Sequence, residues 1–121
     1  FVTRDKLAGL YNDCDVFVFP TLGEGYGLVI LEALSCGVPC IVSNLAGGDD
    51  AIVNGENGFV FNAGDDNDLK KKIEWFIEHS GEIERMSYAS RKSVENLTWD
   101  AYHKAVSNTL SKIINKEVYC E

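Results

Sequence analysis

The spacing of hydrophobic residues changes halfway along the chain. In the first half, short apolar runs alternate with glycine-containing turns, which predicts strands within 15–20, 40–43 and 58–61. Residues 28–35 form a longer apolar run that stops at 37–39 (Gly-Val-Pro), so we expect a largely buried helix there. Because strands that alternate with helices favour a mostly parallel sheet, the sequence predicts an α/β fold.

Helices are expected at both ends of the chain. Thr3 can cap a first helix that runs to about Asn12, and from residue 65 onward apolar residues recur every three or four positions. The last helix should begin at a Thr98 cap, so the C-terminus is helical. The residues expected on the inner faces are Leu7, Leu10, Tyr11, Leu69, Ile73, Phe76, Ile77, Ile83, Met86, Ala89 and Val94, with Trp99, Tyr102, Ala105, Val106, Leu110, Ile113 and Ile114 in the last helix.

Three glycines mark the turn between the first strand and the buried helix. Gly23, Gly25 and Gly27 let the backbone adopt positive φ angles and let a ligand approach, since no Cβ intrudes. The start of the helix offers free amide groups and the positive end of its dipole, which suit a phosphate or diphosphate beyond the carboxyl end of the strand. The dinucleotide fingerprint G-x-G-x-x-G is absent, and Glu32 follows too closely to be its acidic residue, which disfavours nicotinamide binding.

Composition narrows the classes of ligand and partner. The 121 residues are 45% hydrophobic and carry a net charge of −8 with a pI near 4.7, which argues against binding nucleic acid. The cysteines at Cys14, Cys36, Cys40 and Cys120 fit no zinc spacing, so we expect reduced thiols and no metal site. Because the chain begins at Phe1 rather than methionine, we expect it to be a piece of a longer protein.

Two carboxylates, Glu24 in the turn and Glu32 in the helix, have the spacing E-x7-E. Together with the strand before them and the Gly-Val-Pro stop at 37–39, they resemble the donor-site signature of the group 1 (family four) glycosyltransferases, which have the GT-B fold. The segments 54–61 and 97–99 resemble the next landmarks of that family, in the same order. The resemblance covers nearly the whole chain.

The resemblance implies that residues 1–121 are the second half of a C-terminal, nucleotide-sugar-binding domain, which is a Rossmann-like sheet with flanking helices. A glycine-rich strand, basic residues that grip the diphosphate and the acceptor-binding N-terminal domain would lie upstream. The strand at 16–19 would then lack its central neighbour, so we expect a chain that is marginally stable or self-associates through this exposed sheet edge. A cytoplasmic location is implied, with peripheral membrane attachment of the full-length protein left open.

The resemblance also implies roles for individual residues. Glu24 would be the catalytic residue beside the transferred sugar, and Glu32 would accept the two ribose hydroxyls of the nucleotide. The amides of 25–27 would face the sugar and those of 28–29 the diphosphate, whereas Thr21 would either contact phosphate or only cap the turn. The donor-binding positions are Thr21, Gly23, Gly25, Tyr26, Gly27, Leu28, Val29 and Glu32.

Three interpretations of the whole protein remain open. The first is a retaining glycosyltransferase that uses a nucleotide-sugar, an unknown acceptor and neither a metal ion nor another cofactor, with polysaccharide biosynthesis as the expected pathway. The isolated chain would show no turnover, because upstream residues are needed to stabilise the departing diphosphate. The second is a nucleotide- or phosphate-binding module without chemistry of its own. The third is a related GT-B phosphorylase or epimerase.

Overall fold

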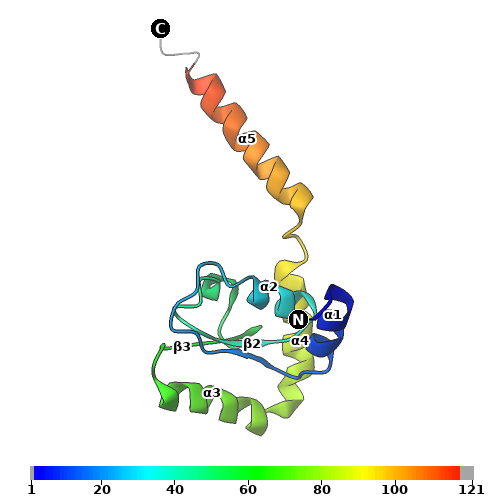
Figure 1. Ribbon diagram of the computed structural model, residues 1–121, viewed down its shortest axis with the longest axis vertical. Helices are drawn as coiled ribbons and strands as arrows, with labels where there is room; N and C mark the ends of the chain where they lie inside the picture. The colour runs from blue at the N-terminus through cyan, green and yellow to red at the C-terminus, as the bar shows by residue number, and fades with distance from the viewer. Residues whose placement is uncertain (1, 118–121) are drawn as a thin grey trace.

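The computed structural model describes residues 2–117, which contain a three-stranded parallel sheet (Figure 1). The strands lie in chain order, β1-β2-β3, and β2 pairs in parallel with both neighbours. The predicted α/β fold with a parallel sheet and flanking helices is therefore confirmed. The elements are α1 (Arg4–Asn12), β1 (Phe17–Phe19), α2 (Leu28–Ser35), β2 (Cys40–Ser43), η1 (Asp49–Ala51), β3 (Gly58–Phe61), α3 (Asp66–Glu78), η2 (Ser80–Glu82), α4 (Ile83–Val94) and α5 (Trp99–Glu117).

The central strand β2 is covered on both faces. All four of its residues are buried, which explains why they read as a continuous run without a polar alternation. Cys40 and Val42 belong to the core layer beneath α2, and Ile41 belongs to the layer beneath α3. The same alternation continues across the sheet, because Phe17 pairs with Cys40 and Phe59 pairs with Ile41.

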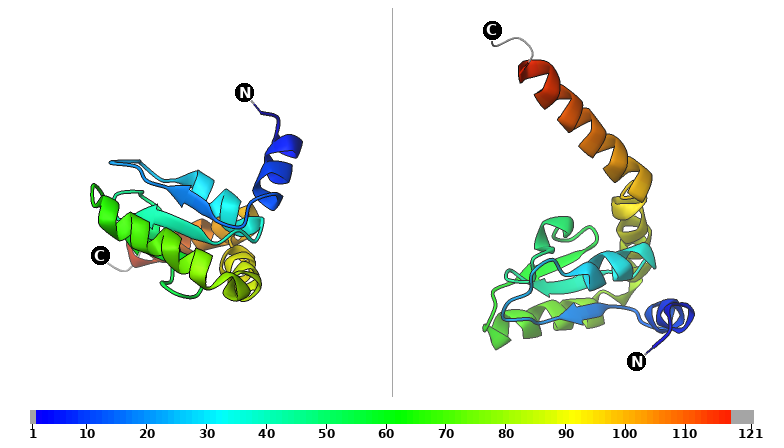
Figure 2. Two further views of the ribbon diagram at one scale, coloured as in Figure 1. Left: turned by 90° about the horizontal axis from the view of Figure 1, so that it is seen from below. Right: turned by 45° about the horizontal axis from the view of Figure 1, so that its top comes forward.

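Helices pack on the two faces of the sheet, with α2 on one side and α3 on the other (Figure 2). On the first side, α2 buries Ile30, Ala33 and Leu34. On the second side, Phe76 of α3 and Met86 of α4 complete a smaller cluster. The side chains of the first layer therefore fix how α2 is seated at the end of β1.

Several residues predicted to face inward are exposed instead. Leu10 of α1 is exposed, as are Ile73 and Ile77 of α3. The helix α2 is buried on one face only, since Leu28 and Glu32 lie on its exposed face. The expectation that this helix is largely buried was wrong, because its apolar composition hides the fact that one side of it faces solvent.

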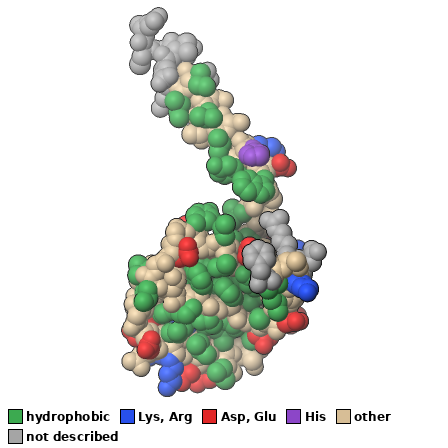
Figure 3. Space-filling view, in the orientation of Figure 1, with side chains coloured by type: hydrophobic (Ala, Val, Ile, Leu, Met, Phe, Trp, Pro, Cys, Tyr) green, Lys and Arg blue, Asp and Glu red, His purple; other side chains and the backbone are tan. Residues whose placement is uncertain are grey.

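The last helix, α5, projects away from the body (Figures 1 and 3). Its predicted cap is confirmed, because Thr98 Oγ1 accepts a hydrogen bond from the N–H of Ala101 at 3.2 Å. Every side chain from Trp99 to Ile114 is exposed, so the apolar stripe predicted to be inward has no packing partner within residues 2–117. Among those residues, no helix has the length and apolar character needed to span a membrane.

Candidate functional site

Two loops lie at the carboxyl edge of the sheet. Residues 21–27 follow β1 and lead into α2, and residues 44–48 follow β2. Because β1 and β2 are parallel neighbours, both loops emerge at the same edge, which is where open α/β sheets bind ligands. The structure thus brings the predicted positions from Thr21 to Val29 together in one loop and the first turn of α2, with Glu32 one turn further on.

Hydrogen bonds join the two loops. The hydroxyl of Ser43, which is fully buried, donates to the carbonyl oxygen of Thr21 at 2.6 Å. The N–H of Glu24 donates to the carbonyl oxygen of Leu45 at 3.1 Å. The backbone around Glu24 is therefore held by β2 as well as by β1. The sequence predicted the 21–27 turn but gave no sign of these bonds or of the role of Ser43.

Glycine is required where the loops touch. Gly47 has φ +66°, and a Cβ on it would lie 2.5 Å from the carbonyl oxygen of Glu24. Gly27 has φ +56°, and a Cβ on it would lie 2.6 Å from the carbonyl oxygen of Ala46. The two backbones approach more closely than any side chain would permit. Nothing in the sequence indicated that Gly47 supports Glu24.

The start of α2 is left open. Its N-cap is Gly27, which offers no side-chain acceptor, and its first turn contains no acidic residue. At the other end, Arg91 Nη1 donates to the carbonyl oxygen of Ser35 at 2.8 Å, which places a positive charge beside the last carbonyls of the helix. The amide groups at the start of α2 can therefore serve an anionic ligand.

The side chains of the 21–27 loop are partly used to shape the loop itself. Thr21 Oγ1 accepts from the N–H of Gly23 at 3.2 Å and lies 3.1 Å from the carbonyl oxygen of the same residue. Of the two roles predicted for Thr21, the structure contains the turn cap, and contact with phosphate stays a prediction. Glu24 is exposed, and its Oε1 accepts the N–H of Gly25 at 2.9 Å. A carboxylate is thus presented at the surface of the loop.

Glu32 lies on the exposed face of α2 beside α1. The hydroxyl of Tyr11 is 3.4 Å from Glu32 Oε2 and 3.4 Å from the carbonyl oxygen of Val29. Burial raises the pKa of Tyr11 to about 12, and the negative charge of Glu32 and the hydrogen bond to it add to that shift. The sequence predicted that Tyr11 faces inward, but nothing in its spacing linked it to Glu32.

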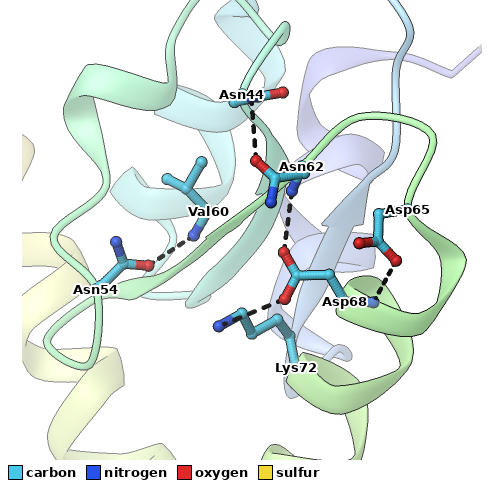
Figure 4. A network of polar contacts seen from close by, with 7 residues as sticks. All are labelled: Asn44, Asn54, Val60, Asn62, Asp65, Asp68 and Lys72. Carbon is cyan, nitrogen blue, oxygen red and sulfur yellow. Dashed lines mark hydrogen bonds and ion pairs between the residues drawn. The ribbon is translucent and has the colours of Figure 1, made fainter.

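Polar side chains hold the neighbouring part of the carboxyl edge (Figure 4). Asn44 Oδ1 accepts the N–H of Ala63 at 2.9 Å, and its Nδ2 lies 3.5 Å from Asn62 Oδ1. Asp68 Oδ2 accepts the N–H of Asn62 at 3.1 Å, and Asp68 Oδ1 lies 3.8 Å from Lys72 Nζ. Asn44 therefore fastens the end of β2 to the segment that follows β3.

The surface around the two loops is open and partly apolar. The exposed large hydrophobic side chains of this region are Leu22, Tyr26, Leu28 and Leu45. A hollow of about 520 Å³ lies near the amino ends of the strands, where Asp15, Gly37 and Ser87 line it. It is therefore separate from the loops, which lie at the carboxyl ends. Within residues 2–117, no group of three or more His, Cys, Asp or Glu residues is placed to hold a metal ion.

This architecture is that of a GT-B glycosyltransferase domain. Sucrose-phosphate synthase (tll1590) from Thermosynechococcus elongatus superimposes with a TM-score of 0.81 and 25% identity, over 95% of this chain and 29% of that chain. Anabaena Alr3699/HepE, solved in complex with UDP, superimposes with a TM-score of 0.75 and 25% identity, over 85% of this chain and 29% of that chain.

The sequence comparisons narrow the class to one family. The family described as Glycosyl transferases group 1 matches residues 1–93, so the chain belongs to that family. The capsular polysaccharide biosynthesis glycosyltransferase CapM of Staphylococcus aureus is 44% identical over 86 residues, which are 71% of this chain and 23% of that protein. The chain spans between a fifth and a quarter of the length of the curated relatives it matches first.

These findings confirm the predicted fold class and the resemblance to group 1 glycosyltransferases. The roles assigned to Glu24, Glu32 and the loop amides stay predictions. The geometry adds three residues that support the predicted site from outside it: Tyr11, Ser43 and Gly47.

Proposed function

We propose that this chain binds the nucleotide-sugar donor of a glycosyltransferase and that the longer protein transfers the sugar to an acceptor with retention of configuration. The observation that carries the proposal is the open start of α2, which lies between the carboxylates of Glu24 and Glu32. Family membership and the UDP complex of Anabaena HepE support it. The assignment to family four, with independence of metal ions, belongs to the same proposal.

The geometry supports a division of roles within the site. The amides of Leu28 and Val29, at the start of α2, would bind the diphosphate, because helix N-termini favour anions. Gly25, Tyr26 and Gly27 would present their amides to the sugar, with Glu24 accepting its hydroxyls. Glu32, one turn into the helix, would accept the two ribose hydroxyls, for which a carboxylate has enough acceptor sites.

The domain assignment has support at the opposite side of β1. Among residues 2–117, β1 pairs with β2 alone, so its other edge has no strand partner. A groove of about 290 Å³ runs beside this edge. Its lining includes Val16, Val18, Ile41, Ile73, Phe76, Ile77 and Ile83. Covering of this groove by an upstream strand and helix would bury Ile73 and Ile77, which the sequence predicted to face inward.

The test is an NMR titration of the isotopically labelled 121-residue chain with UDP, GDP and ADP, followed by their sugar conjugates. We expect one nucleotide to shift resonances between Gly23 and Glu32, and Glu32→Ala to weaken its binding about tenfold, which corresponds to the loss of hydrogen bonds to a charged group. Glu78→Ala is the matched control, because Glu78 is an exposed helical carboxylate at the end of α3.

The outcomes separate the proposed roles from other sites. Shifts that cluster away from the two loops, or binding that Glu32→Ala and Glu78→Ala weaken equally, would contradict the assignment. We also expect no sugar transfer by the chain alone, since the upstream basic residues would be missing. Turnover by the 121-residue chain would refute that part of the proposal.

A further inference from the structure

Tyr11 connects a helix outside the predicted site to the carboxylate inside it. The residue is 8% exposed, and its ring packs edge-on against Phe17 of β1 with centroids 5.6 Å apart. The ring is therefore part of the core between α1, α2 and β1. Its hydroxyl reaches the margin of that core, where it lies 3.4 Å from Glu32 Oε2 and 3.4 Å from the carbonyl oxygen of Val29.

Packing of the ring does not account for the hydroxyl. A phenylalanine would fill the same volume, and a tyrosine buried with its hydroxyl needs a polar partner there. The hydroxyl has one proton to donate, and the carboxylate of Glu32 is the stronger of the two acceptors within reach. Both distances are longer than the usual 2.5–3.0 Å for an O–H···O bond, so the hydroxyl lies between its two acceptors rather than close to one of them.

The contact matters because Glu32 has little else to orient it. Its side chain is exposed on α2 and can adopt several rotamers. Holding the carboxylate in the one orientation that accepts two adjacent hydroxyls therefore costs side-chain entropy. A donor on Oε2 reduces that cost in advance. It also leaves lone pairs on both oxygens, because a carboxylate offers about four acceptor positions.

We propose that Tyr11 is a positioning residue, whose hydroxyl holds Glu32 Oε2 in the orientation that accepts the ribose hydroxyls of the nucleotide. The inference rests on the proposed donor-binding function. The hydroxyl keeps its proton, and therefore its ability to donate, at any physiological pH, as a tyrosine with an ordinary pKa of about 10 also would.

The test compares two ligands that differ only in the ribose hydroxyls, UDP and its 2′,3′-dideoxy analogue, on Tyr11→Phe. We expect UDP affinity to fall about tenfold and the affinity of the dideoxy analogue to stay unchanged, because only the former uses the oriented carboxylate. Tyr88→Phe is the matched control, since Tyr88 is an exposed tyrosine on α4. In the Glu32→Ala background, Tyr11→Phe should have no further effect on UDP binding.

Equal losses for both ligands would overturn the proposal, because they would show a purely structural role for the tyrosine. An unchanged UDP affinity would overturn it as well. If UDP does not bind, the same comparison is made with GDP or ADP and its dideoxy analogue, whichever the titration identifies. Failure of the proposed function looks different: the unmodified chain would bind none of UDP, GDP and ADP, or Glu32→Ala would not weaken the nucleotide that binds, and both inferences would then fall.

A second readout does not require a ligand. With tyrosine labelled at Cζ, NMR can follow the ionisation of Tyr11 directly. We expect Glu32→Gln to lower its titration midpoint from about 12, because the negative charge beside the hydroxyl is removed. An unchanged midpoint would show that the hydroxyl does not interact with Glu32 and would overturn the proposal.

Discussion

Gly47→Ala tests whether the contact between the two loops supports the site. The new Cβ would lie 2.5 Å from the carbonyl oxygen of Glu24 and 2.8 Å from that of Gly25, distances that real Cβ atoms essentially never adopt. Both obstacles are backbone atoms, so neither can rotate aside. The residue also has φ +66°, in the left-handed region that is unfavourable for alanine.

The magnitude follows from these two effects. The left-handed conformation costs about 1–2 kcal/mol, and forcing extra volume into a packed contact costs about 1–3 kcal/mol more. Gly64→Ala is a matched control, because Gly64 has φ +82° and no atom within 4 Å of the added Cβ. This substitution should therefore incur only the cost of the left-handed conformation. We therefore expect Gly47→Ala to lower the free energy of unfolding by about 2–5 kcal/mol and Gly64→Ala by about 1–2 kcal/mol.

Urea unfolding followed by circular dichroism measures both values. The comparison is valid if the slope of the free energy of unfolding against urea concentration is the same for both variants and the unmodified chain. UDP affinity should fall in Gly47→Ala and not in Gly64→Ala, because only the former displaces the backbone of Glu24 and Gly25. Equal destabilisation by the two substitutions would refute the reasoning, since it would show that the loops do not touch as described.

Two further predictions concern ionisation and the sheet edge. Burial raises the pKa of Cys40 to about 12, and that of Tyr11 is also about 12, so the folded chain keeps protons that the unfolded chain releases near pH 9 and 10. The free energy of unfolding should be unaffected below pH 9 and should fall as the pH rises toward 12, less steeply in Tyr11→Phe than in the unmodified chain. Identical pH profiles of the free energy of unfolding in the two proteins would contradict this. One edge of β1 lacks a strand partner within residues 2–117, so we expect the chain either to self-associate or to have a low melting temperature. Sedimentation would detect the self-association, which Val18→Lys should reduce. A clean monomer of high thermal stability would count against the free edge.

The sequence was most informative where glycine or proline marks the end of an apolar run. The helix Leu28–Ser35 and the strands Cys40–Ser43 and Gly58–Phe61 have the predicted bounds. Each is set by local signals, such as the Gly-Val-Pro stop at 37–39, that do not depend on the rest of the fold. The position of the 21–27 loop beyond the carboxyl end of its strand followed from the same pattern.

What failed was the inference from an apolar face to a buried face. Periodicity correctly indicated helices around Leu10, Ile77 and Trp99, yet all three side chains are exposed. A hydrophobic stripe shows that a helix has an apolar side, but not which element covers it. The contacts of Tyr11 with Glu32 and of Gly47 with Glu24 were missed for a related reason, because they join residues that are distant in the chain.

The strand order has a consequence for how the chain acquires its structure. Because β1, β2 and β3 are neighbours in the sheet in the same order as in the sequence, each new strand closes only a short segment of chain against the one before it. Short closures are the least costly in entropy and the fastest to form. The pairing of β2 with β1 also brings the 21–27 and 44–48 loops together. During synthesis we therefore expect the two loops to meet soon after residue 48 leaves the ribosome.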